Sequence, residues 1–569
     1  MRGPLLAVLL LLFTNAARAL VTLPDSSASI GTSKSVVATS DCEAVVGDLC
    51  FGWSVNAWGG ATHQAGTSSS AIHGTNKASQ WFSVTSKGSG DAHLYHPFTF
   101  AYGVTYQATL WMRAEAPATV QVTIRRDGGL YDDVAAKTVT LSGEWQPVSV
   151  KGIYPLRDGE GSVRVNTSTL GVKIHIGKFE LETLSGNPLQ AHLPGRAVNA
   201  NFSGMLVNKL GVHSNWPPIA TKVLRLWDTV TDWRSIETAR DVWDFHRLDY
   251  YLSYAEANGA KVLLTLGQTP SWAAADPDAS CVYDAGCSPP ASNQDWRNYV
   301  RKVAQRYGRR IAFYEIWNEP DYKKFWRGTP EHMVELTRIA KEEIIAANPQ
   351  AIIVSPSVTP TAGVSFLDRF LFLGGGQYID ALGYHNYYSI TPETQLSFVQ
   401  RLRFMTENYP GKSYQFWNTE GAPDCDHRSQ DCKAFEPTDD DKLSSVTRAL
   451  LIMAAQGVDH YSFYAWDIND LTFAPLSDAS YRSLTTTGEA YNRVLGWLSN
   501  AVVRDAFGYQ GVYVVRFSTG TAVWSDKDDV LAQIPAAWRH SNYKDVTGAL
   551  RAIPANKRIR LTRKPVWLR

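Results

Sequence analysis

Two glutamates stand in short motifs that each continue from an apolar run. Glu319 lies in Ile316–Pro320, which reads IWNEP, and Glu420 lies in Trp417–Gly421, which reads WNTEG. Cleavage of a glycosidic bond needs such a pair, because one carboxylic acid protonates the leaving oxygen while the other carboxylate attacks the anomeric carbon. When the anomeric configuration is retained, the two carboxyl groups lie about 5 to 5.5 Å apart. Glu319 and Glu420 are therefore candidates for a catalytic pair, provided that the fold brings them together.

Strands and helices alternate between about residues 199 and 500 and must supply that fold. Apolar strands are predicted within Met205–Val212 and at Val223–Leu226, Val262–Leu266, Ile311–Ile316, Ile352–Val354, Ala381–Tyr384, Tyr414–Trp417 and His460–Ala465. One intervening helix begins at Thr329-Pro330, a favourable N-cap and first-turn pair. Eight strand-helix units in roughly 300 residues is the size of a TIM barrel with enlarged loops. An open doubly wound sheet is the alternative, but the Gly-rich first turn typical of it is absent.

A barrel would place both glutamates in one cleft. The C-terminal ends of all barrel strands converge on one face, where the active sites of such enzymes lie. Glu319 follows the predicted fourth strand directly, and Glu420 ends the seventh. The sequence therefore predicts that these two carboxyl groups meet at that face.

Five segments together resemble the clan of retaining barrel glycosidases that carry an acid/base glutamate after strand four and a nucleophilic glutamate after strand seven. The likeness is closest to glycoside hydrolase family 39 and the related exopolysaccharide endo-glycosidases. It covers the barrel and the tail, not the N-terminal part of the chain. The segments that carry it are Arg225–Asp228 (RLWD), Leu266–Trp272 (LGQTPSW), Tyr314–Pro320 (YEIWNEP), Gly383–Tyr387 (GYHNY) and Asn418–Gly421 (NTEG).

The resemblance implies a role for each glutamate and for three neighbours. Glu319 would be the acid/base and Glu420 the nucleophile. Asn318 would hold the sugar 2-hydroxyl, a contact that strengthens in the transition state. Arg225 and Tyr387 would hydrogen-bond Glu420, since a cation and a donor both favour the ionised carboxylate.

Further side chains are assigned to the same cleft. His385 would line the donor-sugar site, and Asp228 is grouped with the supporting residues. Trp317 and Trp466 would contribute the less polar setting that a carboxyl group needs to stay protonated. Trp272 is grouped with them, because it lies near a strand end where a ring can stack on a sugar face.

Several of these residues have a second interpretation. Trp272 and Trp466 could equally pack in the core. Glu315, on the strand that leads to Glu319, is interpreted as a buried, hydrogen-bonded barrel residue. Lys324, close behind Glu319, could meet an acidic polysaccharide but is better explained as a solvated loop lysine.

The N-terminus of the chain predicts an exported protein, and the net charge argues against nucleic-acid binding. Arg2, the apolar stretch Leu5–Phe13 and Ala17–Ala19 form a signal peptide over residues 1–19, with an uncleaved anchor as the alternative. We therefore expect a secreted or periplasmic protein without a membrane span. The formal charge of +1, from 55 Lys+Arg against 54 Asp+Glu, gives no pull toward nucleic acid. We expect a monomer whose chemistry needs no metal or organic cofactor and whose partner is a polysaccharide or oligosaccharide.

The six cysteines agree with export, because an even count in an exported chain favours disulfides. Nearest-neighbour pairing would join Cys42 to Cys50, Cys281 to Cys287, and Cys425 to Cys432. Zinc binding is less favoured, since the spacings contain no CxxC unit. In a barrel the last two pairs would stiffen loops over the catalytic face and shape the substrate subsites, with general stabilisation of an exported protein as the equal alternative.

The 569 residues exceed what one core holds, and roughly two to four domains are expected. We predict a β-sandwich over 20–187 that resembles jelly-roll carbohydrate-binding modules, the barrel over 188–500, and a small β-sandwich over 501–569. Tryptophans that could form a stacking platform in the first domain are Trp53, Trp58, Trp81, Trp111 and Trp145, although Trp111 falls within an alternating strand and is better explained as a core residue.

The sequence thus predicts a retaining hydrolase of β-linked polysaccharide or oligosaccharide, which could be an exopolysaccharide. Sugar, linkage, and endo or exo action stay open. The alternatives are an exo-acting enzyme of the β-xylosidase or arabinosidase type, transglycosylation through the same intermediate, and a non-catalytic carbohydrate-binding protein.

Overall fold

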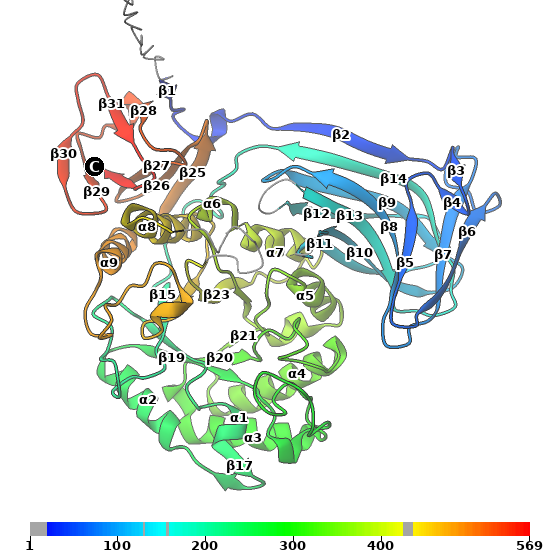
Figure 1. Ribbon diagram of the computed structural model, residues 1–569, viewed down its shortest axis with the longest axis horizontal. Coiled ribbons are helices and arrows are strands. Elements are labelled where there is room, and N and C mark those ends of the chain that lie inside the picture. The colour runs from blue at the N-terminus through cyan, green and yellow to red at the C-terminus, as the bar shows by residue number, and fades with distance from the viewer. Residues whose placement is uncertain (1–19, 129–130, 155–158, 396, 425–435) are drawn as a thin grey trace, which may run out of the picture.

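The computed structural model describes residues 20–128, 131–154, 159–395, 397–424 and 436–569. Figure 1 shows a central barrel with a β-sandwich at one side and a smaller β-region near the C-terminus. This architecture confirms the predicted fold class, a TIM barrel with an N-terminal β-sandwich and C-terminal strands. Among the described helices, none combines the length and the apolar character that crossing a bilayer requires.

Eight parallel strands close the barrel in sequence order, because the first pairs with the eighth. They are β15 (Ser203–Leu206), β16 (Val223–Leu226), β19 (Lys261–Leu266), β20 (Phe313–Ile316), β21 (Ile352–Val354), β22 (Ala381–His385), β23 (Gln415–Gly421) and β24 (His460–Phe463). Nearly all of their residues are buried, as expected for strands covered on both faces. Each overlaps a strand predicted from the sequence. The polar motifs therefore lie at the ends of the strands to which the sequence assigned them.

Helices cover the outside of the barrel. The longer ones are α2 (His246–Ala257), α3 (Asn293–Tyr307), α4 (Pro330–Ala347), α5 (Gly363–Phe372), α7 (Phe398–Thr406), α8 (Asp439–Ala455) and α9 (Thr486–Leu498). The short ones are α1 (Trp233–Ile236) and α6 (Pro392–Gln395). Helix α4 begins as predicted: Pro330 is in its first turn, and the Thr329 side chain accepts a hydrogen bond from the backbone NH of His332.

The N-terminal sandwich consists of two antiparallel sheets. One contains β11 (Asp133–Leu141), β10 (Ala118–Arg126), β13 (Gly159–Thr167), β8 (Ala92–Phe100) and β5 (Ser54–Ala57). The other contains β12 (Gln146–Ile153), β9 (Thr105–Ala114), β14 (Ile174–Ser185), β7 (Ser79–Ser86) and β6 (Thr62–Ser68), with β2 (Ser33–Ser40) paired to β14. Strand β9 alternates strictly between buried and half-buried residues, which is the pattern of a strand with one face on the core.

A polar contact docks the sandwich on the barrel. Asp368 of α5 is fully buried and accepts hydrogen bonds from Thr138 at 2.6 Å and from the Gln121 amide at 3.0 Å. Both partners lie on the sandwich. A buried carboxylate that lost these donors would bear a large desolvation cost, so the contact fixes the sandwich against α5.

The C-terminal sheet packs against α8 and α9. Its strands are β25 (Val503–Tyr509), β26 (Val512–Phe517), β27 (Gly520–Ser525), β32 (Val566–Leu568), β29 (Asn542–Asp545) and β30 (Leu550–Ala552). Val503, Ala506, Val515 and Trp524 join the hydrophobic core of the barrel. The C-terminal region therefore packs one side on the barrel core, while Phe507, Val514 and Leu561 belong to a separate C-terminal core.

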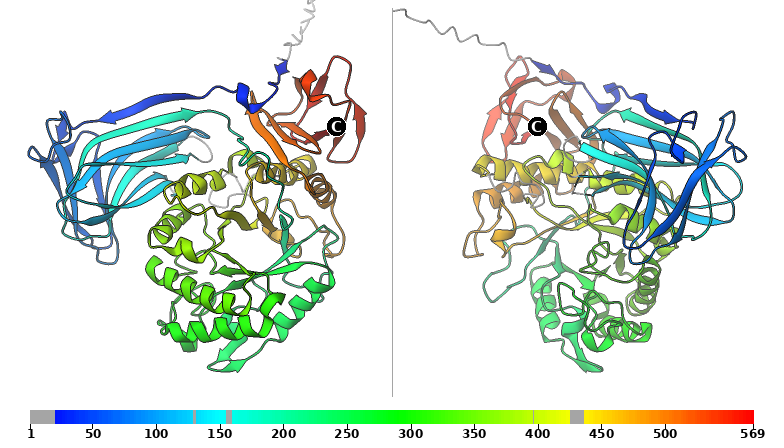
Figure 2. Two further views of the ribbon diagram at one scale, coloured as in Figure 1. Left: turned by 180° about the vertical axis from the view of Figure 1, so that it is seen from behind. Right: turned by 45° about the vertical axis from the view of Figure 1, so that its right-hand side comes forward.

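The start of the described chain differs from the predicted division at residue 20. Strand β1 (Val21–Thr22) pairs in parallel with β28 (Val530–Gln533), which in turn pairs with β31 (Arg558–Leu561). Leu23 is buried in the same C-terminal core. Figures 1 and 2 show the chain running from there across to the sandwich, where β2 begins. Two strand residues carry too little pattern to indicate which sheet they join, so the sequence assigned them to the wrong one.

Two predicted disulfides are confirmed. Cys42 is bonded to Cys50 in the sandwich, and Cys281 is bonded to Cys287 in the loop between β19 and α3. The predicted pair Cys425 and Cys432 lies outside the described residues.

Candidate active site

The C-terminal ends of four barrel strands bring the polar motifs together. Arg225 lies in β16, His385 ends β22, and Glu420 is the penultimate residue of β23. Glu319 follows β20 after a turn in which Trp317 and Glu319 both have positive φ angles, +75° and +47°. Such backbone is costly for residues with a side chain and persists only where its surroundings impose it, as at functional sites.

The two predicted glutamates meet. One side-chain oxygen of Glu319, one of Glu420 and a ring nitrogen of His385 all lie within 4.8 Å of one another. This separation matches a retaining pair and is shorter than the roughly 6.5 to 9.5 Å that leaves room for water in an inverting enzyme. His385 Nδ1 lies 2.8 Å from Glu319 Oε1 and 3.8 Å from Glu420 Oε1. The imidazole therefore bridges the pair.

Arg225 connects the pair to the barrel interior. Its side chain is fully buried and donates from Nη1 to Glu420 Oε2 at 2.8 Å and from Nη2 to Asn318 Oδ1 at 2.8 Å. Its Nε donates to Glu315 Oε2 at 2.9 Å. A buried guanidinium needs such partners, because an unpaired buried charge is strongly destabilising. One cation thus orients residues of strands β20 and β23 at once.

Glu420 is 7% exposed and has a donor on each oxygen: Arg225 on Oε2, and the Tyr387 hydroxyl on Oε1 at 2.6 Å. Burial on its own would raise the pKa of Glu420. The charges of His385 and Arg225 and the tyrosine hydrogen bond outweigh burial and lower that pKa below its ordinary value. Glu420 is therefore the carboxylate that the site holds ionised.

His385 responds in the opposite direction. Burial opposes a charge on its ring, but the two glutamates outweigh that effect and raise the pKa of His385 above its ordinary value. The raised pKa favours the imidazolium between the carboxyl groups.

Glu315 is buried as predicted. Its carboxylate is fully buried and accepts hydrogen bonds from Arg225, from Thr265 at 2.5 Å and from Ser357. Burial would raise the pKa of Glu315, but the Arg225 charge and these donors lower it. The sequence did not reveal that Glu315 and Glu420 share one arginine.

The three predicted tryptophans pack rather than surround the carboxyl groups. Trp466 is 0% exposed in the barrel core and donates to the carbonyl of Tyr481 at 3.0 Å. Trp317 is buried against the ring of Trp326. Trp272 is half-buried and donates to a backbone carbonyl of a neighbouring loop. Core packing, the alternative interpretation of Trp466, therefore describes that ring, and Trp317 packs on another ring as well. The chain turns beyond each strand end, so strand alternation no longer gives the direction of a ring.

Two tyrosines at the cleft were missed. Tyr464 directly follows β24 and donates to Asp228 Oδ2 at 2.8 Å, and Tyr283 donates to Asp228 Oδ1. Position after strand eight was a usable signal for Tyr464, since Glu319 was found by the same reasoning after strand four. Tyr283 lies within the Cys281–Cys287 loop, which the sequence assigned to the catalytic face without selecting a residue.

Two carboxylates and an imidazole at this spacing are also potential metal ligands. Both oxygens of Glu420 already accept hydrogen bonds, and a guanidinium cation adjoins them. The hydrogen bonds account for the arrangement of Glu420 without an ion, and the expectation of metal-free chemistry stays a prediction.

Comparisons with known proteins agree with this geometry. Residues 213–389 match the model for glycosyl hydrolases family 39, and residues 50–169 match a carbohydrate binding domain. A β-xylosidase of Caldicellulosiruptor saccharolyticus is 27% identical over 151 residues, which is 25% of this chain and 31% of that protein. The match thus spans about a third of the curated relative.

A solved structure shares the fold, and a second is reported beside it. The structure of a family 39 glycoside hydrolase from Bacteroides cellulosilyticus WH2 aligns with a TM-score of 0.50 at 14% identity, over 80% of this chain and 95% of that one. A family 39 β-xylosidase from Caulobacter crescentus aligns at 15% identity with a TM-score of 0.47, over 66% of this chain and 97% of that one.

The barrel, the paired glutamates and the family match over residues 213–389 make this chain similar to the glycoside hydrolases of family 39. The resemblance to family 39 predicted from the sequence is confirmed over these residues, and the structure of the family 39 enzyme from Bacteroides cellulosilyticus WH2 shares the fold.

Proposed function

We propose that the protein hydrolyses β-linked polysaccharide or oligosaccharide with retention of the anomeric configuration. The observation that carries this proposal is the separation of Glu319, His385 and Glu420, whose polar atoms lie within 4.8 Å of one another. That spacing allows one carboxylate to reach the anomeric carbon while the other reaches the leaving oxygen.

In the first step Glu420 attacks the anomeric carbon as Glu319 transfers its proton to the leaving oxygen. The glycosidic bond breaks, and an ester joins the sugar to Glu420. In the second step Glu319, now a carboxylate, takes a proton from water, whose oxygen attacks the same carbon and releases Glu420. Two inversions leave the product with the configuration of the substrate.

The partners of the two glutamates support this division of roles. Glu420 is held ionised by Arg225 and Tyr387, as a nucleophile must be. Glu319 is half-buried, and its hydrogen bond to His385 holds it beside the pair. The amide oxygen of Asn318 accepts a hydrogen bond from Arg225. Its amide nitrogen is therefore the group that can donate to a sugar hydroxyl.

The sandwich is proposed to hold a polymeric substrate. Trp111 projects from the outer face of its strand, and the imidazole of His73 stacks on it at 4.5 Å, with Trp145 edge-on to His73 at 5.4 Å. Partly exposed rings on a flat sheet offer a surface on which sugars stack. Such a platform favours action on a polymer, including an exopolysaccharide. The name of the β-xylosidase relative favours exo action on xylosides instead, and product analysis by chain length distinguishes the two.

The remaining parts of the proposal concern the setting of the protein. Residues 1–19 would be a cleaved signal peptide, and the two described disulfides are typical of an oxidising compartment. We infer a secreted or periplasmic monomer with the sandwich over 20–187, the barrel over 188–500 and the C-terminal strands over 501–569, apart from the N-terminal strand noted above.

Stereochemistry tests the proposed reaction. We expect the first-formed sugar to keep the anomeric configuration of the bond cleaved, because Glu420 and then water attack from opposite faces. Proton NMR of an aryl glycoside digest, recorded before mutarotation, identifies the anomer. An initial product of inverted configuration would exclude the covalent intermediate.

A further inference from the structure

A third carboxylate adjoins the proposed catalytic pair. Asp228 follows β16 with a positive φ of +58° and is half-buried. It accepts hydrogen bonds from Tyr464 on one oxygen and from Tyr283 on the other. Both tyrosines pack against the small cluster of Leu206, Trp227 and Ala465. Two tyrosines from separate parts of the barrel thus hold the Asp228 carboxylate in place.

The position of Tyr283 is fixed by the disulfide. Tyr283 lies inside the loop closed by Cys281–Cys287, and its ring is 5.9 Å from that of Trp227, edge to face. A short cross-linked loop has few conformations, so the ring reaches Asp228 without an ordering cost when substrate binds. The disulfide therefore acts on the cleft through this tyrosine.

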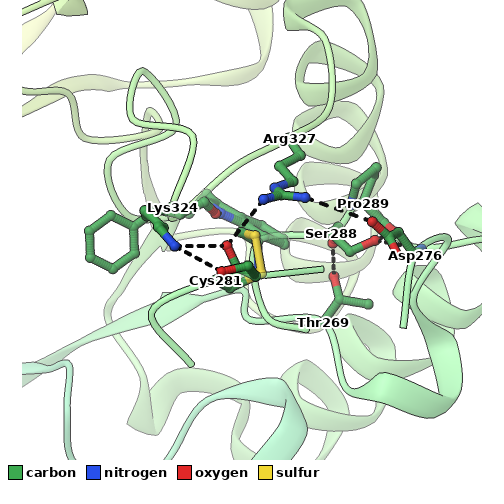
Figure 3. Close-up of a disulfide and its surroundings, with 11 residues drawn as sticks. Thr269, Asp276, Cys281, Ser288, Pro289, Lys324 and Arg327 are labelled. Atoms are coloured by element: carbon green, nitrogen blue, oxygen red, sulfur yellow. Dashed lines mark hydrogen bonds and ion pairs between the residues drawn. A yellow bond between two sulfur atoms is a disulfide. The ribbon is translucent and has the colours of Figure 1, made fainter. Parts of the chain in front are cut away.

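The loop that follows Glu319 is hydrogen-bonded to the disulfide loop. Lys324 donates to the hydroxyl and the carbonyl of Ser280 at 2.9 and 3.3 Å, and Arg327 donates to the same carbonyl at 3.2 Å. The backbone NH of Arg327 also donates to the carbonyl of Cys287 at 2.8 Å. In Figure 3, Arg327 lies above the disulfide and Lys324 to its left, and dashed lines run from both to the chain beside Cys281. The predicted solvated lysine is therefore a structural contact of this wall.

The hydrogen bonds define Asp228 as an acceptor. Burial raises the pKa of both Tyr283 and Tyr464, and the Asp228 charge adds to the shift, so both hydroxyls keep their protons. Because each oxygen of Asp228 accepts one of these protons, the arrangement is that of an ionised carboxylate. Burial raises the pKa of Asp228, the two tyrosines oppose the shift, and the charge of Glu420 adds to it. The backbone NH of Tyr464, which holds Asp228, donates to the carbonyl of Gly421 at 3.0 Å, so Asp228 is held beside the strand end that carries Glu420.

The cations nearest these carboxylates are already engaged. Arg225 binds Glu420, and His385 binds Glu319. Behind Tyr283, Arg234 binds Asp284 at 2.6 Å. A negatively charged sugar entering near Asp228 and Glu420 would find each of these three cations already paired with a carboxylate. Like charges in a partly desolvated site repel strongly.

We propose that Asp228, fixed by Tyr283 and Tyr464, makes this cleft select sugars that present a hydrogen-bond donor, a hydroxyl or an ammonium group, and reject uronic acids. This inference rests on the proposed function, since it assigns the substrate class of the same cleft. Asp228 is a specificity-determining residue, and Tyr283 is a positioning residue that acts through it.

Three aryl glycosides that differ only at carbon 6 test the charge preference: 4-nitrophenyl β-D-glucoside, its 6-amino-6-deoxy analogue, and the β-D-glucuronide. We expect the full-length protein to cleave the glucuronide with a kcat/KM at least about 100-fold below the other two. Asp228→Asn keeps the shape of the side chain and removes its charge. The ratio of kcat/KM between the 6-amino glycoside and the glucuronide should therefore fall by about tenfold or more in this variant. Equal cleavage of all three, or a gap unchanged in the variant, overturns the proposal.

Matched variants separate positioning from folding. Tyr283→Phe and the double variant Cys281→Ser/Cys287→Ser should both shift the same substrate ratio in the direction of Asp228→Asn. Tyr322→Phe, at an exposed tyrosine of the neighbouring loop, should leave the ratio unchanged. A lowered melting temperature in the cysteine variant with the wild-type ratio would show that the disulfide only stabilises the fold.

A binding series keeps the inference separate from turnover. In Glu420→Gln, calorimetry with the same three glycosides should show the 6-amino compound binding about tenfold or more tightly than the glucuronide. The order should disappear in Glu420→Gln/Asp228→Asn. If the wild type cleaves none of the three glycosides but the variant binds them in this order, the result contradicts the proposed hydrolysis and leaves the role of Asp228 standing. An order that survives without Asp228, or no binding of any probe, contradicts the inference.

Discussion

Replacing Glu420 with glutamine lowers kcat by at least about 10⁴-fold on any substrate that the protein cleaves, because an amide cannot form the glycosyl ester. Glutamine preserves the length and most of the volume of the side chain. Arg225 keeps Glu315 and Asn318 as partners, so the buried guanidinium is not left unpaired. We therefore expect the melting temperature to change little. Steady-state kinetics with an aryl glycoside, together with calorimetric melting, measure both effects.

The matched control is Glu331→Gln, an exposed glutamate in the first turn of α4. It removes the same charge far from the strand ends and should leave kcat unchanged. Turnover of Glu420→Gln within about tenfold of the wild type would remove Glu420 from the mechanism.

The second large effect is expected at Glu319. In Glu319→Ala, substrates with poor leaving groups should lose about 10³-fold or more in kcat, because no acid protonates the departing oxygen. Dinitrophenyl glycosides need little protonation and should still form the intermediate, which then persists because the base is gone. Azide, which attacks without needing a base, should restore turnover and give a β-glycosyl azide from a β-linked substrate.

Rescue by azide separates loss of the acid/base from general damage to the fold. The same azide concentration should change wild-type turnover little, since water is already activated there. A uniform loss for good and poor leaving groups, with no azide product, would show that Glu319 does not act as the proton donor.

Strand ends account for what the sequence could predict. In a parallel barrel the chain direction alone places every C-terminal strand end on one face, so Arg225, Glu319, His385 and Glu420 could be brought together without knowledge of any side-chain conformation. The roles of Arg225, His385 and Tyr387 followed from the resemblance to the barrel glycosidases. The barrel itself followed from apolar strands with buried residues on both faces.

Side-chain direction beyond a strand end could not be predicted in the same way. Trp466 and Tyr464 both follow β24, but only Tyr464 reaches Asp228, while Trp466 packs in the core. Which of two nearby rings enters the cleft depends on turns that have no period. For the same reason Tyr283 was hidden inside a loop whose position was predicted correctly.

Contacts between distant segments were the other feature that the sequence could not predict. Strand β1 joins β28 across the whole length of the chain, and the sharing of Arg225 by Glu315 and Glu420 depends on where three side chains end. Neither follows from local pattern, because both are decided by packing and by the need of buried polar groups for partners.

Covalent trapping tests the central claim most directly. The wild-type protein is incubated with the 2,4-dinitrophenyl 2-deoxy-2-fluoro derivative of the sugar that it cleaves best, in which the fluorine slows both steps and the good leaving group spares the first. Peptide mass spectrometry then locates the label. We predict one sugar per chain, attached to Glu420 and absent in Glu420→Gln. A label on another residue, or steady turnover of the parent glycoside with no covalent adduct at all, would contradict the double-displacement account.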